Sequence, residues 1–129
     1  MPNFDSPDDV LRGTCLCGAV AYRAQGPLCA TSHSYCTMCQ RQHGAAGSYG
    51  NVHADGFVVE RGAAQLTHYQ KSPKGRCSFC GVCGSMLYWS GTDTPERIAL
   101  TLGTLQPAWT GTVEREWFTE HRPSWLPPA

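Results

Sequence analysis

The sequence predicts a small, mainly β domain, on three observations. Short apolar stretches rich in β-branched and aromatic residues recur along the chain, and each is bounded by glycine, proline or other turn residues. Two close cysteine pairs, Cys15-Leu16-Cys17 and Cys80-Gly81-Val82-Cys83, are each followed by a glycine. A length of 129 residues, 41% of them hydrophobic, suits one modest core. We therefore expect a single domain over residues 13–122, with a loose N-terminal tail over 1–12 and a C-terminal tail over 123–129.

The pattern predicts short strands joined by turns, which favours antiparallel pairing. We expect strands over residues 19–23, 28–35, 57–60, 65–70, 86–89, 98–102 and 113–119. Residues 36–43 are expected to form one short helical turn, because a Cys-x-x-Cys turn leads into residues that accept helix. Gly44, Gly47 and Gly50 are expected to break it.

Charge and hydropathy exclude several classes of partner. The formal net charge is +0, so no overall field draws the chain to nucleic acid or to an anionic membrane. No apolar run approaches the roughly 20 residues that cross a bilayer. The first nine residues have neither a basic start nor an apolar run, which argues against a signal peptide and for a cytoplasmic protein without a membrane partner.

The sequence has eight cysteines, and the cytoplasm in which we expect the protein is a reducing compartment. There, cysteines serve as metal ligands or reactive thiols more often than as disulfides, which would be favoured only in a secreted protein. Cys15, Cys17, Cys80 and Cys83 lie in two short turns that can direct four thiolates to one point, the preferred shell of a structural zinc ion. The alternative, four unrelated buried thiols, would need a small apolar pocket at both pairs.

The order of motifs resembles a known family. The matching segments are Gly13-x-Cys15-x-Cys17-Gly18-Ala19-Val20-x-Tyr22, Gly26-Pro27, Cys36-x-x-Cys39-x-x-x-His43-Gly44, Phe79-Cys80-x-x-Cys83-Gly84-Ser85 and Arg97-Ile98-Ala99-Leu100-Thr101-Leu102-Gly103-Thr104-Leu105. Together they are similar to the glutathione-dependent formaldehyde-activating enzyme and centromere protein V family. The resemblance implies an Mss4-like zinc-binding fold and a structural zinc on the same four cysteines.

A second metal site is where the sequence departs from that family. The resemblance implies a central Cys-x-Cys-x-x-Cys that holds a catalytic zinc, but here Ser34 replaces the first cysteine of Ser34-Tyr35-Cys36-Thr37-Met38-Cys39. A neutral serine is a poor zinc ligand. We expect Cys36 and Cys39 to be the catalytic residues and the ligands of a second zinc that is weak, labile or absent. The candidates for a third donor are His33, His43, Cys29 and Cys77, and we favour core packing for the two cysteines and a loop position for His43.

The resemblance implies a zinc-dependent carbon–sulfur lyase, similar to S-hydroxymethylglutathione synthase, that acts on glutathione or a related small thiol. The two carboxylates of glutathione need cationic partners, and Arg41 is our candidate for binding them. Lys71, Lys74 and Arg76 could extend a basic rim, and Trp117, Phe118 and Trp125 could form a pocket wall. Without a second zinc, Cys36 and Cys39 could act as a redox pair or as reactive thiols.

The alternative is a non-catalytic zinc-binding module that keeps the fold and has lost the reaction together with the cysteine at position 34. Such a module could bind a protein or a nucleic acid, although the neutral charge argues against nucleic acid. A methionine sulfoxide reductase would share a zinc-bearing β scaffold, but its reductase signature around a late lone cysteine is not found in the sequence. The natural substrate and the oligomeric state are left open.

Overall fold

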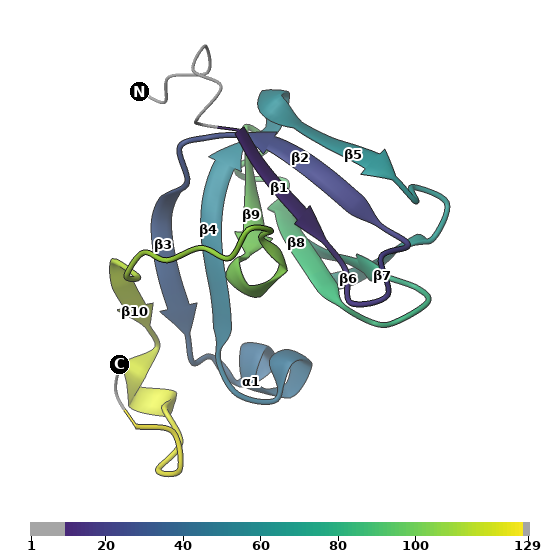
Figure 1. Cartoon of the computed structure of the whole chain (residues 1–129). Helices are drawn as coiled ribbons and strands as arrows, with labels where there is room; N and C mark the ends of the chain where they lie inside the picture. Colours follow the sequence, from purple (N-terminus) through teal and green to yellow (C-terminus); the bar gives the residue numbers. More distant parts are fainter. Residues whose placement is uncertain (1–9, 128–129) are drawn as a thin grey trace.

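The computed structural model describes residues 10–127, which form two β-sheets and one short helix (Figure 1). The strands are β1 (Val10–Thr14), β2 (Ala21–Gln25), β3 (Cys29–Ser34), β4 (Gly47–His53), β5 (Phe57–Arg61), β6 (Leu66–Ser72), β7 (Gly75–Cys80), β8 (Met86–Gly91), β9 (Arg97–Thr101) and β10 (Arg115–Trp117). The helix is α1 (Thr37–His43), and short 3-10 turns are η2 (Ala54–Gly56), η3 (Leu102–Thr104) and η4 (Thr119–His121). The mainly β fold with one short helix is confirmed.

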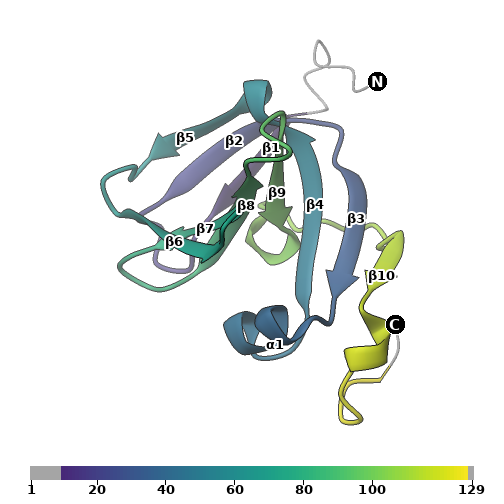
Figure 2. The same ribbon diagram turned by 180° about the vertical axis from the view of Figure 1, so that it is seen from behind.

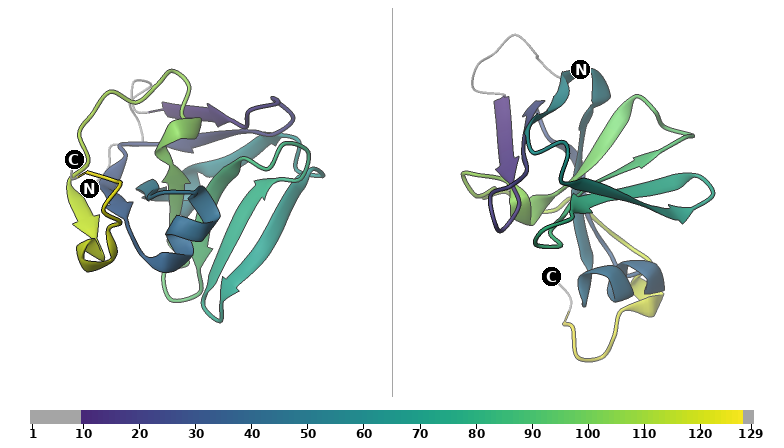
Figure 3. Two further views of the ribbon diagram at one scale, coloured as in Figure 1. Left: turned by 90° about the horizontal axis from the view of Figure 1, so that it is seen from below. Right: turned by 90° about the vertical axis from the view of Figure 1, so that its right-hand side faces the viewer.

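The strands divide into a three-stranded sheet, β1-β2-β5, and a seven-stranded sheet, β10-β3-β4-β9-β8-β7-β6. Figure 2 shows the larger sheet from behind, with α1 beyond one end of β3 and β4. Figure 3 shows the two sheets meeting at an angle. The pairs are antiparallel except for β10 beside β3, which is parallel and departs from the expectation of antiparallel strands. A parallel pair needs a long connection, and the long chain between β3 and β10 provides it.

The core lies between the two sheets. On β2, Tyr22 and Ala24 are buried at 1% and 0% exposure while Arg23 between them is exposed, the alternation of a strand with one face on a core. The buried apolar cluster consists of Cys15, Val20, Tyr22, Ala24, Val52, Cys80, Leu87, Tyr88, Ile98, Leu100 and Leu105. Two of the predicted metal ligands, Cys15 and Cys80, therefore belong to the core itself.

Gly44 ends α1 as expected, but the sequence analysis did not predict β4, a central strand paired with β3 and β9. Gly50 lies within this strand because a side chain there would have no room. A Cβ on Gly50 would lie 2.6 Å from the Leu28 Cγ atom. Glycine at such a position permits a close approach of a neighbouring side chain and does not indicate a turn.

The expected N-terminal tail also needs correction where the structure describes it. Strand β1 begins at Val10 and pairs with β2, so residues 10–12 belong to a sheet. We propose that the domain begins at Val10. The rest of the expected tail, residues 1–9, and residues 128–129 lie outside the described residues. Between 10 and 127, no helix has the length and apolar character needed to cross a bilayer.

Candidate functional site

The two cysteine pairs that were predicted to bind a structural zinc come together in space. Cys15 and Cys17 lie in the turn between β1 and β2, while Cys80 ends β7 and Cys83 lies in the turn that follows. The Sγ atoms of Cys15 and Cys17 are 3.7 Å apart, those of Cys17 and Cys80 are 3.8 Å apart, and all four lie within 4.8 Å of one another. A tetrahedral zinc with Zn–S bonds of about 2.3 Å places its sulfurs about 3.8 Å apart. The four thiols thus have the spacing that a zinc ion requires.

The two turns are built alike. Gly18 donates its N–H to the carbonyl oxygen of Cys15 at 3.2 Å, and Gly84 donates to that of Cys80 at 2.8 Å. Both glycines have a left-handed backbone, with φ of 81° and 83°. Because that conformation is strained for residues with a side chain, the glycine after each pair is part of the turn that aims the sulfurs.

Backbone donors also point at these sulfurs. The Val20 N–H donates to the Cys15 sulfur at 3.3 Å, and the Cys80 sulfur accepts two N–H groups at 3.4 and 3.5 Å. Hydrogen bonds to the side chain and backbone of Ser85 lower the pKa of Cys83 to about 5. Donors of this kind favour the thiolate, which is the form that binds a metal.

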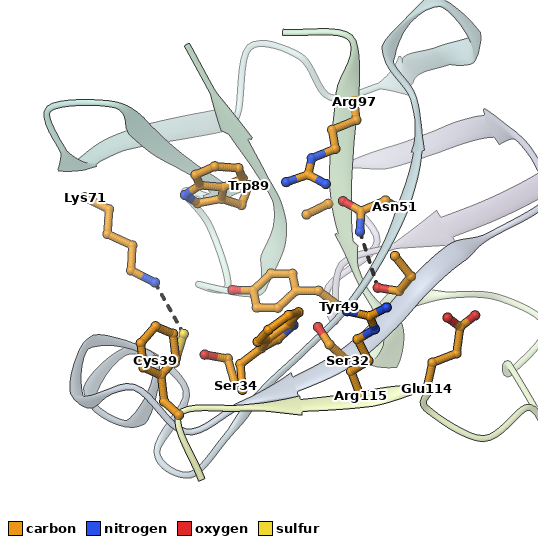
Figure 4. Close-up of a pocket in the computed structure, with 14 residues that line it drawn as sticks. Ser32, Ser34, Cys39, Tyr49, Asn51, Lys71, Trp89, Arg97, Glu114 and Arg115 are labelled. Atoms are coloured by element: carbon orange, nitrogen blue, oxygen red, sulfur yellow. Dashed lines mark hydrogen bonds between the residues drawn. The ribbon is translucent and has the colours of Figure 1, made fainter. Parts of the chain in front are cut away.

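The remaining pair of thiols, Cys36 and Cys39, lies at the start of α1. The Cys36 sulfur accepts the Cys39 N–H at 3.3 Å and so caps the helix, while Cys39 is buried at 5% exposure. The Ser34 side chain lies near both sulfurs and acts to lower the pKa values of Cys36 and Cys39. From β6, the Lys71 ammonium reaches to 3.5 Å from the Cys39 sulfur, as Figure 4 shows. The structure thus brings Ser34, Cys36 and Cys39 together and places beside them Lys71, one of the cations expected to extend a basic rim.

These contacts move the two pKa values in opposite directions. For Cys36, burial acts to raise the pKa, but hydrogen bonds from Cys39 and Ser34 and the charge of Lys71 outweigh it, and the pKa is lowered. For Cys39, burial dominates and the pKa is raised, although the hydrogen bond to Ser34 opposes it. Cys36 is therefore the thiol of the pair that ionises more readily.

The two candidate histidine donors for this pair are engaged elsewhere. The His43 Nε2 atom lies 2.6 Å from the Tyr49 hydroxyl, and the His33 Nδ1 atom lies 2.8 Å from the Ser48 hydroxyl. Burial and then the charge of Lys71 lower the pKa of His43, so its ring is neutral near pH 7. A neutral ring in this place serves as a hydrogen-bond partner of Tyr49.

The two candidate cysteine donors do not complete the site either. Cys29 is exposed and contacts the carbonyl oxygen of Pro27, and Cys77 is fully buried within β7. In the part of the chain from 10 to 127, the only group of three or more Cys, His, Asp or Glu with metal-binding spacing is the cluster of Cys15, Cys17, Cys80 and Cys83. Cys36 and Cys39 therefore have a hydroxyl and an ammonium as neighbours where a catalytic zinc would need a third anionic or imidazole ligand. A second zinc does not fit this donor set.

A pocket of about 630 Å³ opens beside Cys39 (Figure 4). It is lined by Ala30, Ser32, Ser34, Cys39, Tyr49, Asn51, Lys71, Trp89, Arg97, Ala99, Glu114, Arg115, Trp117 and Phe118. Trp117 and Phe118 form part of the wall, as expected, whereas Trp125 is not among the lining residues.

Positive charge predominates in this pocket. Lys71, Arg97 and Arg115 line it with a single carboxylate, Glu114. Within residues 10–127 none of these three cations forms an ion pair with a carboxylate. The Arg115 guanidinium lies 5.7 Å from the centre of the Trp117 ring, a cation–π distance.

Two other cations that the sequence analysis named, Arg41 and Lys74, do not line the pocket. Arg41 is exposed in the last turn of α1 and does not line the pocket, so its role in ligand binding stays a prediction. Lys74 is paired with Asp93 at 3.1 Å. The sequence analysis missed Arg97 and Arg115, because no short motif marks residues that only the pairing of distant strands brings together.

Fold and site together define a small β-sheet protein with a cluster of four cysteines at metal-binding spacing and a separate pocket beside the Cys39 thiol. The family model described as "Glutathione-dependent formaldehyde-activating enzyme" matches residues 10–121. The chain belongs to this family.

Two relatives agree with the assignment. A Halomonas elongata protein named "Putative glutathione-dependent formaldehyde-activating enzyme" is 28% identical over 125 residues, covering 91% of this chain and 80% of that protein. The crystal structure of a Rhodobacter sphaeroides protein has a TM-score of 0.68 and 27% identity, and the match covers 82% of this chain and 98% of that one.

Proposed function

We propose that the protein makes and breaks a carbon–sulfur bond between a small anionic thiol, such as glutathione, and formaldehyde. The observation that carries this proposal is the charge of the pocket. Figure 4 places Lys71 and Cys39 on one side of it and Arg97 and Arg115 on the other. A ligand with a thiol at one end and carboxylates at the other matches this distribution.

The arginines suit the carboxylates. A guanidinium binds a carboxylate through two parallel hydrogen bonds, and unpaired cations in a pocket are free to do so. Glutathione has two carboxylates, so Arg97 and Arg115 would take one each. The Lys71 ammonium would then stabilise the substrate sulfur as its thiolate near Cys39.

The reaction needs a proton donor as well as a thiolate. The sulfur attacks the carbon of formaldehyde, a carbon–sulfur bond forms, and the carbonyl oxygen gains a proton to give the hydroxymethyl thioether. The Tyr49 hydroxyl lines the pocket, and burial, followed by the charges of nearby cysteines, raises its pKa. Tyr49 therefore stays protonated at neutral pH and is positioned to donate to that oxygen.

Zinc enters this proposal as a structural ion. None of the four clustered cysteines lines the pocket. A zinc bound by Cys15, Cys17, Cys80 and Cys83 would supply folding energy, and the reacting groups would depend on it only through the fold.

The test is two-dimensional exchange NMR of glutathione mixed with formaldehyde, which measures how fast the free thiol and its hydroxymethyl adduct interconvert. The wild type should accelerate exchange well above the protein-free rate. The double variant Arg97→Ala/Arg115→Ala should need at least about 100-fold more glutathione for the same effect, because charge-assisted hydrogen bonds contribute about 1.5–3 kcal/mol each. Arg12→Ala removes an exposed arginine outside this pocket and should behave as wild type.

A second candidate is a non-catalytic module that binds the thiol without turning it over. The presence of Ser34 where the family has a cysteine favours this alternative. Exchange at the protein-free rate, together with glutathione binding that Arg97→Ala/Arg115→Ala weakens, would support binding alone and refute the enzyme. Neither exchange nor binding would refute both assignments of the pocket.

A further inference from the structure

We propose that the Cys36–Cys39 site works without a metal ion, and that the Lys71 ammonium supplies the positive charge that a zinc would supply in the family. The site is thus an ammonium–thiol centre. This inference concerns the charge and ligands of the site, so it holds whether or not the carbon–sulfur reaction takes place there.

The position of Lys71 is the first argument. Its Nζ atom lies 3.5 Å from the Cys39 sulfur, and this side chain extends from β6 toward Cys39 of α1 along one side of the pocket (Figure 4). A zinc bound to the same sulfur at about 2.3 Å would lie no more than about 6 Å from Nζ. Two cations at that distance in a half-buried site repel each other strongly. The charge of the Lys71 ammonium therefore weakens the binding of a zinc to the Cys39 sulfur.

The hydrogen bonds around the sulfurs are the second argument. The Cys39 sulfur is contacted by the Lys71 ammonium at 3.5 Å. The Cys36 sulfur accepts the Cys39 N–H at 3.3 Å and so caps the helix. The positively charged group beside the Cys39 sulfur is therefore a side chain of the protein.

The donor set is the third argument. Ser34 offers a neutral hydroxyl, and the nearby His43 ring is held by the Tyr49 hydroxyl at 2.6 Å. By contrast, the four-cysteine cluster has sulfurs 3.7 and 3.8 Å apart, and among residues 10–127 no lysine, arginine or histidine is hydrogen-bonded to them. The same chain thus contains one centre built for a metal and one centre in which a cation of the protein takes its place.

The first experiment is elemental analysis of zinc per folded chain, after gel filtration without chelator in buffer containing micromolar zinc. Wild type and the double variant Cys36→Ser/Cys39→Ser should both contain one zinc. Two zincs in the wild type, falling to one in the double variant, would overturn the proposal. This measurement involves no substrate, so its outcome is independent of the exchange assay.

The second experiment restores the metal site. The double variant Ser34→Cys/Lys71→Met should bind a second metal, followed as the thiolate-to-cobalt absorption when Co²⁺ is added to zinc-loaded protein. Ser34→Cys alone, which keeps the ammonium, should bind Co²⁺ at least tenfold more weakly than the double variant. The matched control is Ser34→Cys/Lys74→Met, which removes an exposed lysine paired with Asp93 and should bind like Ser34→Cys alone. Equal Co²⁺ affinity with and without Lys71, or no second metal in Ser34→Cys/Lys71→Met, would overturn the role given to Lys71.

Discussion

Replacing Cys17 with serine isolates the contribution of the metal to folding. Cys17 is exposed, so a hydroxyl of nearly the same size leaves no cavity and buries no polar group. Its sulfur lies 3.7 Å from that of Cys15 and 3.8 Å from that of Cys80, inside the predicted zinc shell. Cys80, at 0% exposure, would be a poorer choice, because its replacement would also disturb the core.

The expected magnitude follows from the length of chain that the metal closes. Cys17 and Cys80 are 63 residues apart in the sequence. A cross-link that closes a loop of this size removes unfolded-state entropy equivalent to about 4 kcal/mol at 25 °C. The free energy of unfolding of a whole domain is about 5–15 kcal/mol, so Cys17→Ser should lower the melting temperature by roughly 15 °C or leave the chain unfolded.

The assay is thermal unfolding followed by circular dichroism, together with zinc content, for the wild type, Cys17→Ser and Cys29→Ser. Cys29 is exposed and outside the cluster, so Cys29→Ser should melt with the wild type and keep its zinc. Adding a zinc chelator should lower the wild-type melting temperature toward that of Cys17→Ser. If Cys17→Ser kept one zinc per chain and melted within about 2 °C of the wild type, the conclusion that a zinc bound at the four-cysteine cluster stabilises the fold would be refuted.

Three further predictions concern the core. Burial raises the pKa of Tyr22 to about 12 against the hydrogen bond to Thr104, so the folded state favours the neutral phenol. That contribution to the free energy of unfolding, about 3 kcal/mol, is fully present below pH 10 and is lost between pH 10 and 12. In Tyr22→Phe, urea midpoints measured over the same pH range should not show this loss. An equal alkaline loss in both proteins would contradict the prediction. Leu87→Ala, at a side chain 1% exposed, should reduce the free energy of unfolding in urea by about 2–5 kcal/mol, and a loss below about 1 kcal/mol would show that the core repacks. Gly50→Ala should cost about 1–3 kcal/mol in the same assay because its Cβ would meet Leu28, and failure of Leu28→Ala to recover most of that cost would disprove the clash.

The features that the sequence predicted correctly are encoded locally. The four-cysteine cluster depends on two short turns, each recognisable from two cysteines and a glycine, and the helix expected at 36–43 is found at Thr37–His43. Spacing within a few residues determines both features, so both could be predicted without knowing which strands pair.

The pocket could not be predicted in this way. Arg97 begins β9 and Arg115 begins β10, and they share a pocket only because β9 pairs with β4 and β10 pairs with β3. Strand β4 itself was missed, because its glycines are typical of turns unless the neighbouring Leu28 is already in place. Register and close packing depend on contacts between residues far apart in the chain, and one sequence without its structure does not reveal them.

The placement of the two thiol centres explains how the chain can lack a cysteine at position 34 and still fold. Cys15 and Cys17 belong to a turn of the three-stranded sheet, whereas Cys80 and Cys83 belong to the seven-stranded sheet, so a metal between them ties the sheets together. The pocket lies along the larger sheet and α1 and shares no lining residue with that cluster. A change at Ser34 therefore alters the chemistry of the pocket without removing the link between the sheets. The same separation is consistent with our proposal for Lys71, because the charge beside Cys39 can change while the four-cysteine cluster stays intact.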